Sequence, residues 1–122
     1  MEFGVSCGYI NQIGFVSHAE NLGFDYAWFS DTHLIRSNIW ATMAVAAQQT
    51  RTIRLGSGLA IPGLRLAPVA ACGIATINRI APGRTFFGTG TGNTAMRTMG
   101  QAPMPQEFGA LLTQAAVWLE DR

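Results

Sequence analysis

Short runs of apolar residues alternate along the chain with longer stretches in which apolar residues recur every three or four positions. The short runs predict β-strands, and the longer stretches predict helices with one apolar side. The expected strands are residues 2–7, 26–30, 52–60 and 85–88. The expected helices are residues 11–22, 37–49 and 67–80, with a last one beginning near Pro105. The pattern therefore predicts four strand–helix units in succession.

Successive strands are separated by enough residues for a right-handed crossover helix, which predicts a parallel sheet with outer helices. No linker or change in composition divides the chain, so residues 1–122 are expected to form one α/β domain. A closed barrel of eight such units needs about 250 residues. The chain has 122 residues and four units. We therefore expect unpaired edges on the first and fourth strands and an apolar sheet face exposed to water.

Composition and charge narrow the possible partners. Charged residues make up 12% of the chain and hydrophobic ones 48%, which excludes intrinsic disorder and favours a surface partly covered by a partner or by a missing remainder. A net charge of +1 gives no electrostatic basis for binding nucleic acid or an anionic membrane. Cys7 and Cys72 lie far apart, so no metal site is predicted. No long apolar run or export signal is evident, and a cytoplasmic protein is expected.

Candidate chemistry lies where strands end, because ligands of parallel α/β sheets meet the loops after the carboxyl ends of the strands. Asp31 and His33 follow the second expected strand. An imidazole exchanges protons at neutral pH, and a nearby carboxylate can orient it or accept hydrogen bonds from a ligand. In the alternative interpretation, Asp31 caps the next turn and His33 is a surface residue.

Glycines interrupt the next two strand ends. Gly58 indicates a bulge or a place where a ligand touches the backbone, or else a simple strand end. Arg65 follows, either as an anion contact or, in the favoured interpretation, as a solvated loop residue. In residues 88–93, glycine alternates with threonine before Asn93, which combines bare backbone with short hydrogen-bonding side chains. The spacing differs from the dinucleotide fingerprint and from the P-loop.

Three tracts in this order, residues 19–34, 50–68 and 75–93, resemble the bacterial luciferase-like superfamily of flavin- and deazaflavin-dependent enzymes. With the helices between them they span nearly the whole chain. The resemblance implies the amino-terminal (βα)4 half of a (β/α)8 TIM barrel. It also implies a cofactor, coenzyme F-420 or FMN, lying across the carboxyl ends of the strands.

The same resemblance assigns roles to individual residues. It implies a bulge with a non-proline cis peptide at Gly58–Leu59, against the back of the cofactor ring. His33 is expected to transfer a proton, although Thr32 separates it from Asp31 where many deazaflavin members have the two residues adjacent. The residues assigned to the cofactor are Asp31, Gly58, Leu59, Gly90, Thr91, Gly92 and Asn93.

The implied reaction is hydride transfer between coenzyme F-420 and a small organic substrate. One alternative is an FMN-dependent monooxygenase. Another is a catalytically incomplete half barrel that acts only as a binding or assembly module, either as a homo-oligomer or beside a missing carboxyl-terminal half. Sequencing the coding region past Arg122 would separate a complete enzyme from such a fragment.

Overall fold

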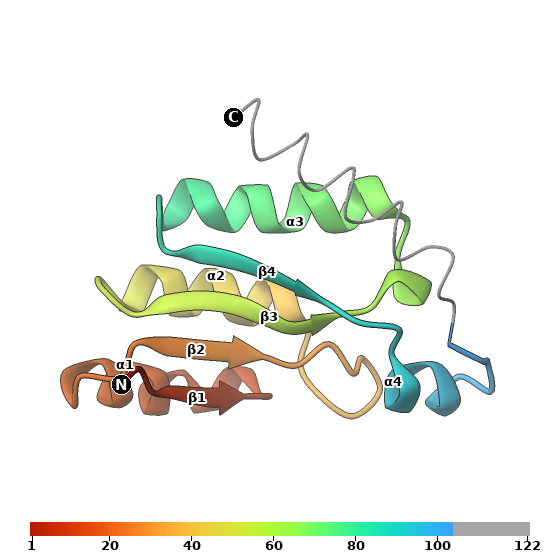
Figure 1. Ribbon diagram of the computed structural model, residues 1–122, viewed down its shortest axis with the longest axis horizontal. Helices are drawn as coiled ribbons and strands as arrows, with labels where there is room; N and C mark the ends of the chain where they lie inside the picture. Colours follow the sequence, from red (N-terminus) through yellow and green to blue (C-terminus); the bar gives the residue numbers. More distant parts are fainter. Residues whose placement is uncertain (104–122) are drawn as a thin grey trace.

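The computed structural model describes residues 1–103 and has the expected alternation of strands and helices. The four strands are parallel and pair in the order β1-β2-β3-β4 (Figure 1). The strands are β1 (Gly4–Cys7), β2 (Tyr26–Phe29), β3 (Arg54–Ala60) and β4 (Thr85–Thr89). The helices are α1 (Ile13–Asn21), α2 (Ile39–Gln49), α3 (Ala67–Ile80) and α4 (Asn93–Thr98), with 3-10 turns η1 (Ile10–Gln12) and η2 (Pro62–Leu64). The helix expected near Pro105 lies outside the described residues.

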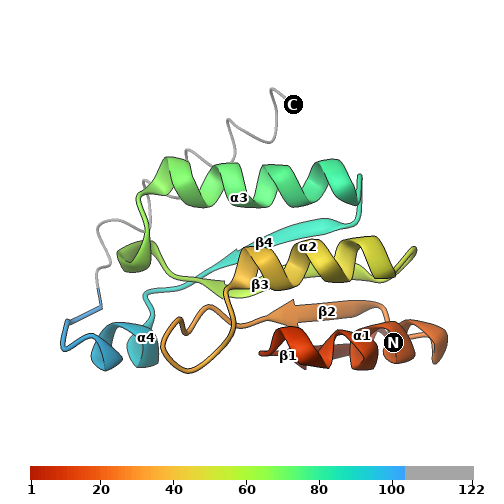
Figure 2. The same cartoon turned by 180° about the vertical axis from the view of Figure 1, so that it is seen from behind.

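Helices α1, α2 and α3 cover one face of the sheet, as the views from front and back show (Figures 1 and 2). Side chains of a strand point alternately to opposite faces, so every second residue enters the core. In β2, Ala27 and Phe29 are buried, whereas Trp28 between them is 40% exposed. The core between sheet and helices includes Val16, Met43 and Leu55, all fully buried. The pattern of the sequence thus predicted the layers correctly.

The opposite face of the sheet carries a cluster of aromatic rings formed by Tyr26, Trp28 and Phe86. The ring centroids of Trp28 and Phe86 are 4.6 Å apart, and those of Tyr26 and Phe86 are 5.7 Å apart. Gly56 makes room for this cluster, because a Cβ there would lie 2.1 Å from the Phe86 ring. Within residues 1–103 no helix covers this face (Figure 1). The exposure of Trp28 agrees with the expected apolar face.

Local capping explains where the observed boundaries differ from the expected ones. Helix α2 begins at Ile39, two residues later than expected, because the Asn38 side chain accepts hydrogen bonds from the Trp40 and Ala41 N–H groups. This arrangement is an N-cap. Helix α4 was not predicted, and it follows Gly92, whose φ of 80° ends the preceding extended segment.

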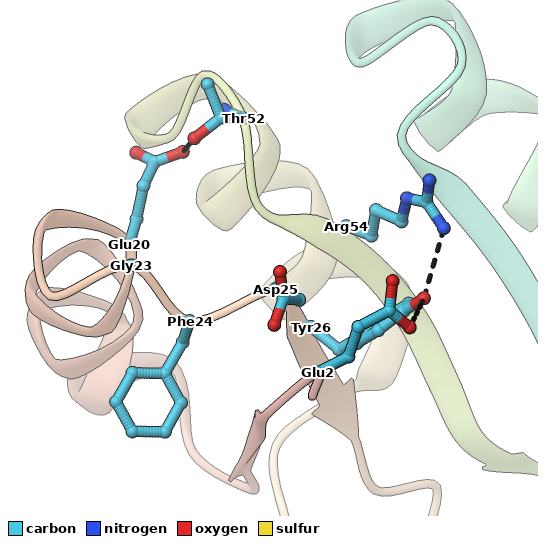
Figure 3. A pocket seen from close by; sticks show the side chains of 8 residues that line it. All are labelled: Glu2, Glu20, Gly23, Phe24, Asp25, Tyr26, Thr52 and Arg54. Carbon is cyan, nitrogen blue, oxygen red and sulfur yellow. Dashed lines mark hydrogen bonds between the residues drawn. The ribbon is translucent and has the colours of Figure 1, made fainter.

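A half-buried carboxylate holds the turn before β3. Glu20 of α1 accepts hydrogen bonds from the N–H groups of Arg51, Thr52 and Ile53 at 2.8, 2.5 and 2.9 Å. It lines a pocket of about 260 Å³ at the amino ends of the strands, where Tyr26 also lies between Glu2 and Arg54 (Figure 3). Burial alone would raise the pKa of Glu20, but these hydrogen bonds outweigh it and lower the pKa from 4.5 to about 2.

Replacing Glu20 by glutamine is expected to remove part of the acid sensitivity of the fold. Because the folded pKa is depressed, the ionised carboxylate stabilises the fold fully above pH 4.5, and this stabilisation is lost as the pH falls toward 2. The loss should be about 1 kcal/mol, since the group is partly screened by water. Urea unfolding at a series of pH values measures it. Thr52→Ala is the matched variant, because it keeps the three N–H bonds and removes only the bond from the Thr52 hydroxyl to Glu20 at 2.9 Å, so most of the pH dependence should remain. Parallel pH curves for Glu20→Gln and the parent chain would contradict the prediction.

Candidate functional site

A cleft of about 470 Å³ opens at the carboxyl ends of β2, β3 and β4. Each of these strands contributes the loop or bulge that follows it, as expected for a parallel sheet. The lining residues are Ser30, Asp31, Thr32, Gly58, Leu59, Ile61, Gly90, Thr91, Gly92, Asn93, Thr94 and Ala95. All seven residues that the family resemblance assigned to a cofactor are among them. Segments that are more than 60 residues apart in the chain, such as Asp31 and Asn93, thus meet around one cavity.

The β3 wall of the cleft is irregular. The peptide bond between Gly58 and Leu59 is cis, and the register of β3 with β4 shifts between Ser57 and Ala60. This is the bulge that the resemblance implied. Leu59 is 44% exposed, so an apolar side chain faces the open space. Its Cδ1 atom would lie 2.5 Å from a Cβ at Gly90, so a side chain at position 90 would meet Leu59.

The loop after β4 packs tightly on the segment after β3. The Gly90 N–H donates to the Ala60 carbonyl at 3.1 Å. A Cβ at Gly92 would lie 2.1 Å from Cγ2 of Ile61. The positive φ of Gly92 also favours glycine. Packing between the two loops therefore explains these glycines, whereas the sequence alone had left close approach by a ligand and a tight turn as alternatives.

Asp31 lies in a buried ion pair at the edge of the cleft. Its residue is 3% exposed, and its two carboxylate oxygens accept from Nη1 and Nη2 of Arg65 at 2.5 and 2.7 Å. The Ile61 N–H donates to Oδ2 at 3.1 Å. The expectation that Arg65 is a solvated loop residue was wrong, because its side chain is only 15% exposed and its guanidinium lies 5.7 Å from the Trp40 ring centre. The available signal was an acidic and a basic residue after neighbouring strands.

His33 is not among the residues that line the cleft. Its Nδ1 atom is buried and has no hydrogen-bond partner within the part of the chain that the structure describes. The structure therefore groups the expected cofactor residues but does not bring His33 into the same lining. Its role in proton transfer stays a prediction.

Residues 1–103 show neither a cluster of metal ligands nor a membrane-spanning helix. No three His, Cys, Asp or Glu side chains in this range lie close enough together to hold a metal ion. None of the helices there is long and apolar enough to cross a membrane.

A family model described as luciferase-like monooxygenase matches residues 7–113, which include all three cleft-forming segments. The chain belongs to this family. A 5,10-methylenetetrahydromethanopterin reductase of Archaeoglobus fulgidus is 37% identical to the luciferase-like chain over 93 residues. These residues make up 76% of the chain but 28% of the relative.

Solved structures agree with the family assignment. A coenzyme F-420 dependent tetrahydromethanopterin reductase from Methanopyrus kandleri superposes with a TM-score of 0.74 at 30% identity, covering 87% of this chain and 31% of that one. The oxygenating constituent of 3,6-diketocamphane monooxygenase from Pseudomonas putida, a type II Baeyer–Villiger monooxygenase in complex with FMN, gives 0.72 at 18% identity. The superposition covers 97% of this chain and 38% of the monooxygenase. At this low identity the similarity shows only that the two proteins share a fold. The luciferase-like chain thus has the (βα)4 half of the barrel and spans about a third of these proteins.

Proposed function

We propose that the luciferase-like chain binds the ring of coenzyme F-420 in the cleft and takes part in hydride transfer between that cofactor and a small organic substrate. The observation that carries the proposal is the cleft itself, which gathers all seven expected cofactor residues. Its volume of about 470 Å³ lies in the usual range for small-molecule sites. The relatives that are named as reductases, one of them F-420 dependent, support the choice of cofactor and reaction.

The residues around the cleft fit a flat ring with polar edges. Leu59 offers an exposed apolar side chain on which a ring can rest. Thr91 and Asn93 offer a hydroxyl and an amide, and Ser30 on the opposite side offers a second hydroxyl. When bound, a deazaflavin or flavin supplies the hydride chemistry. The task of these side chains is to hold and orient the ring.

We assign the accompanying proton to His33. His33 carries the imidazole of this loop, the side-chain type that most often serves as a general acid or base, and its Nδ1 atom has no hydrogen-bond partner in residues 1–103. Thr32, its neighbour in the chain, lines the cleft. Unchanged turnover in a His33→Gln protein would contradict the assignment. A cytoplasmic location likewise stays a prediction from the sequence.

Replacing Leu59 by glutamate is expected to weaken binding of the cofactor ring at least about tenfold, because a charge replaces the apolar surface under the ring. Titrations of the full chain with coenzyme F-420 and with FMN, followed by absorbance and fluorescence, measure the affinity. Leu22→Glu is the matched control, since Leu22 is 65% exposed after α1 and does not line the cleft.

The titrations also separate the candidate cofactors. Preference for FMN would favour the monooxygenase alternative over the deazaflavin reductase. If the parent chain binds neither cofactor at micromolar concentration, the proposed function fails for this chain. Equal affinities of the Leu59→Glu and Leu22→Glu variants would instead show that the cofactor ring does not bind against Leu59.

The uncovered aromatic face favours a second candidate function, that of a binding or assembly module. Tyr26, Trp28 and Phe86 together present apolar surface that a second copy or further strands would bury. Exposed edges at β1 and β4 would add unpaired backbone groups. Sedimentation velocity on the purified chain tests this candidate, and a compact monomer at all concentrations would contradict self-association.

A further inference from the structure

The ion pair between Asp31 and Arg65 joins the segments that follow β2 and β3. Asp31 follows β2, whereas Arg65 follows the η2 turn after β3. Both guanidinium Nη atoms donate to the carboxylate, a two-pronged geometry that fixes orientation as well as distance. The ring centre of Trp40 in α2 lies 5.7 Å from the guanidinium carbon of Arg65. The loops after β2 and β3 are therefore held to each other and to a helix of the core.

The carboxylate is already engaged by the protein. Three hydrogen bonds reach its two oxygens, two from Arg65 and one from the Ile61 N–H. A carboxylate offers about four acceptor positions in total. With Asp31 only 3% exposed, its main partner is thus Arg65 and not a ligand in the cleft.

The contacts continue from Ile61 to the glycine loop. Ile61 is 8% exposed and packs with Ala95 and Met96 of α4 in a small apolar cluster. Its Cγ2 atom occupies the space that a side chain at Gly92 would need. The position of Ile61 therefore sets the position of the loop before α4. Through Asp31, that position depends on Arg65.

We infer that Arg65 is a positioning residue for the cofactor cleft, acting through Asp31 and Ile61 on the loop that contains Gly90 and Gly92. Arg65 itself does not line the cleft. The inference rests on the proposed function for its effect on cofactor binding. Its effect on the geometry of the loop can be measured without any cofactor.

Proton–nitrogen NMR spectra of the ligand-free full chain test the geometry. Arg65→Gln is expected to shift the amide signals of Ile61, Gly90 and Gly92. Arg79→Gln is the control, because it removes the same charge from an exposed position on α3. Arg65→Lys should give smaller shifts than Arg65→Gln, since lysine keeps the positive charge but cannot donate two parallel hydrogen bonds to the carboxylate. Shifts at these three amides no larger than those in Arg79→Gln would overturn the inference.

Titration of the same variants with coenzyme F-420 and FMN tests the consequence for binding. Arg65→Gln should weaken the affinity roughly tenfold, with partial recovery in Arg65→Lys. An affinity within twofold of the parent chain would overturn the positioning role. If the parent chain binds neither cofactor, the proposed function fails, while the ligand-free spectra still decide whether Arg65 positions the loop.

Arg65→Gln leaves the buried carboxylate of Asp31 without its ion-pair partner and could unfold the chain for that reason alone. A double variant avoids this problem. Asp31→Asn with Arg65→Gln removes both charges and keeps side chains that can hydrogen bond. If Arg65→Gln does not fold, the double variant and Arg65→Lys take its place. Displaced signals of Gly90 and Gly92 in both would support the inference, and signals at their parent positions in both would overturn it.

Discussion

Replacing Arg84 by alanine is expected to lower the free energy of unfolding by about 3 kcal/mol. The Arg84 guanidinium donates four hydrogen bonds between α2 and the start of β3. Nη1 reaches Oγ1 of Thr50 at 3.1 Å and the Ile53 carbonyl at 2.9 Å. Nη2 reaches the carbonyls of Ala47 and Thr50 at 3.0 and 3.1 Å. One side chain immediately before β4 is thus hydrogen-bonded both to the end of α2 and to the residue before β3.

The effect should be large because three backbone carbonyls would lose the hydrogen bonds that Arg84 donates to them. Those of Ala47 and Thr50 lie at the end of α2, where helix carbonyls lack partners within the helix. Ala47, Thr50 and Ile53 are all at most 4% exposed, so water cannot readily replace the guanidinium. A cation at this helix end also interacts favourably with the helix dipole.

Urea unfolding followed by tryptophan fluorescence measures the loss. Arg84→Lys should keep part of the stability, because an ammonium retains the charge but cannot reach all four acceptors. Arg79→Ala is the matched control, since Arg79 is exposed in the last turn of α3 and should change stability by less than about 0.5 kcal/mol. A loss below about 1 kcal/mol in Arg84→Ala would mean that the carbonyls find other partners.

Local signals predicted the elements best where they were strong. Helix α3 was predicted at its observed bounds, because Pro68 suits a first helical turn and Pro82–Gly83 prevents continuation. The start of β3 was placed too early, at Thr52 and not at Arg54. There, residues 51–53 form a turn held by Glu20, which lies some 30 residues earlier. Such a contact leaves no trace in a local pattern.

The gathering of the seven expected cofactor residues around one cleft was predictable, because the topology brings the carboxyl ends of parallel strands together. The contacts within the group were not. Arg65 pairs with Asp31, which depends on the shape of the η2 turn. His33 lies in the loop between β2 and α2, whose path no periodicity specifies, and it falls outside the lining. Met96 is fully buried in the small cluster with Ile61.

Replacing Gly92 by alanine is expected to lower the free energy of unfolding by about 2–3 kcal/mol and to weaken cofactor binding at least about tenfold. Two costs combine at this position. The backbone has a φ of 80°, where a residue with a Cβ is strained by about 1 kcal/mol. The added Cβ would also lie 2.1 Å from Cγ2 of Ile61, so Ile61 or the loop must move.

Gly83→Ala separates these two costs. Gly83 has a similar φ of 71°, but a Cβ there would meet no heavy atom within 4 Å in residues 1–103. This control should therefore lose only the backbone term, about 1 kcal/mol, and should bind cofactor like the parent chain. Urea unfolding and cofactor titration of both variants give the comparison. Equal losses of stability in the two variants would show that the contact with Ile61 costs nothing.

A second substitution tests whether Ile61 is the obstacle. Ile61→Ala removes the Cγ2 atom that the new side chain would meet, at its own cost of about 2–4 kcal/mol for a core deletion. If the clash is real, the double variant should lose less stability than the sum of the losses in the two single variants. The reason is that the Cβ added at position 92 can occupy the space that Ile61→Ala vacates. Additive losses would place the strain in the backbone alone. The Ile61 N–H also donates a hydrogen bond to Asp31. Energetic coupling between Gly92 and Ile61 would therefore connect the glycine loop to the ion pair of Asp31.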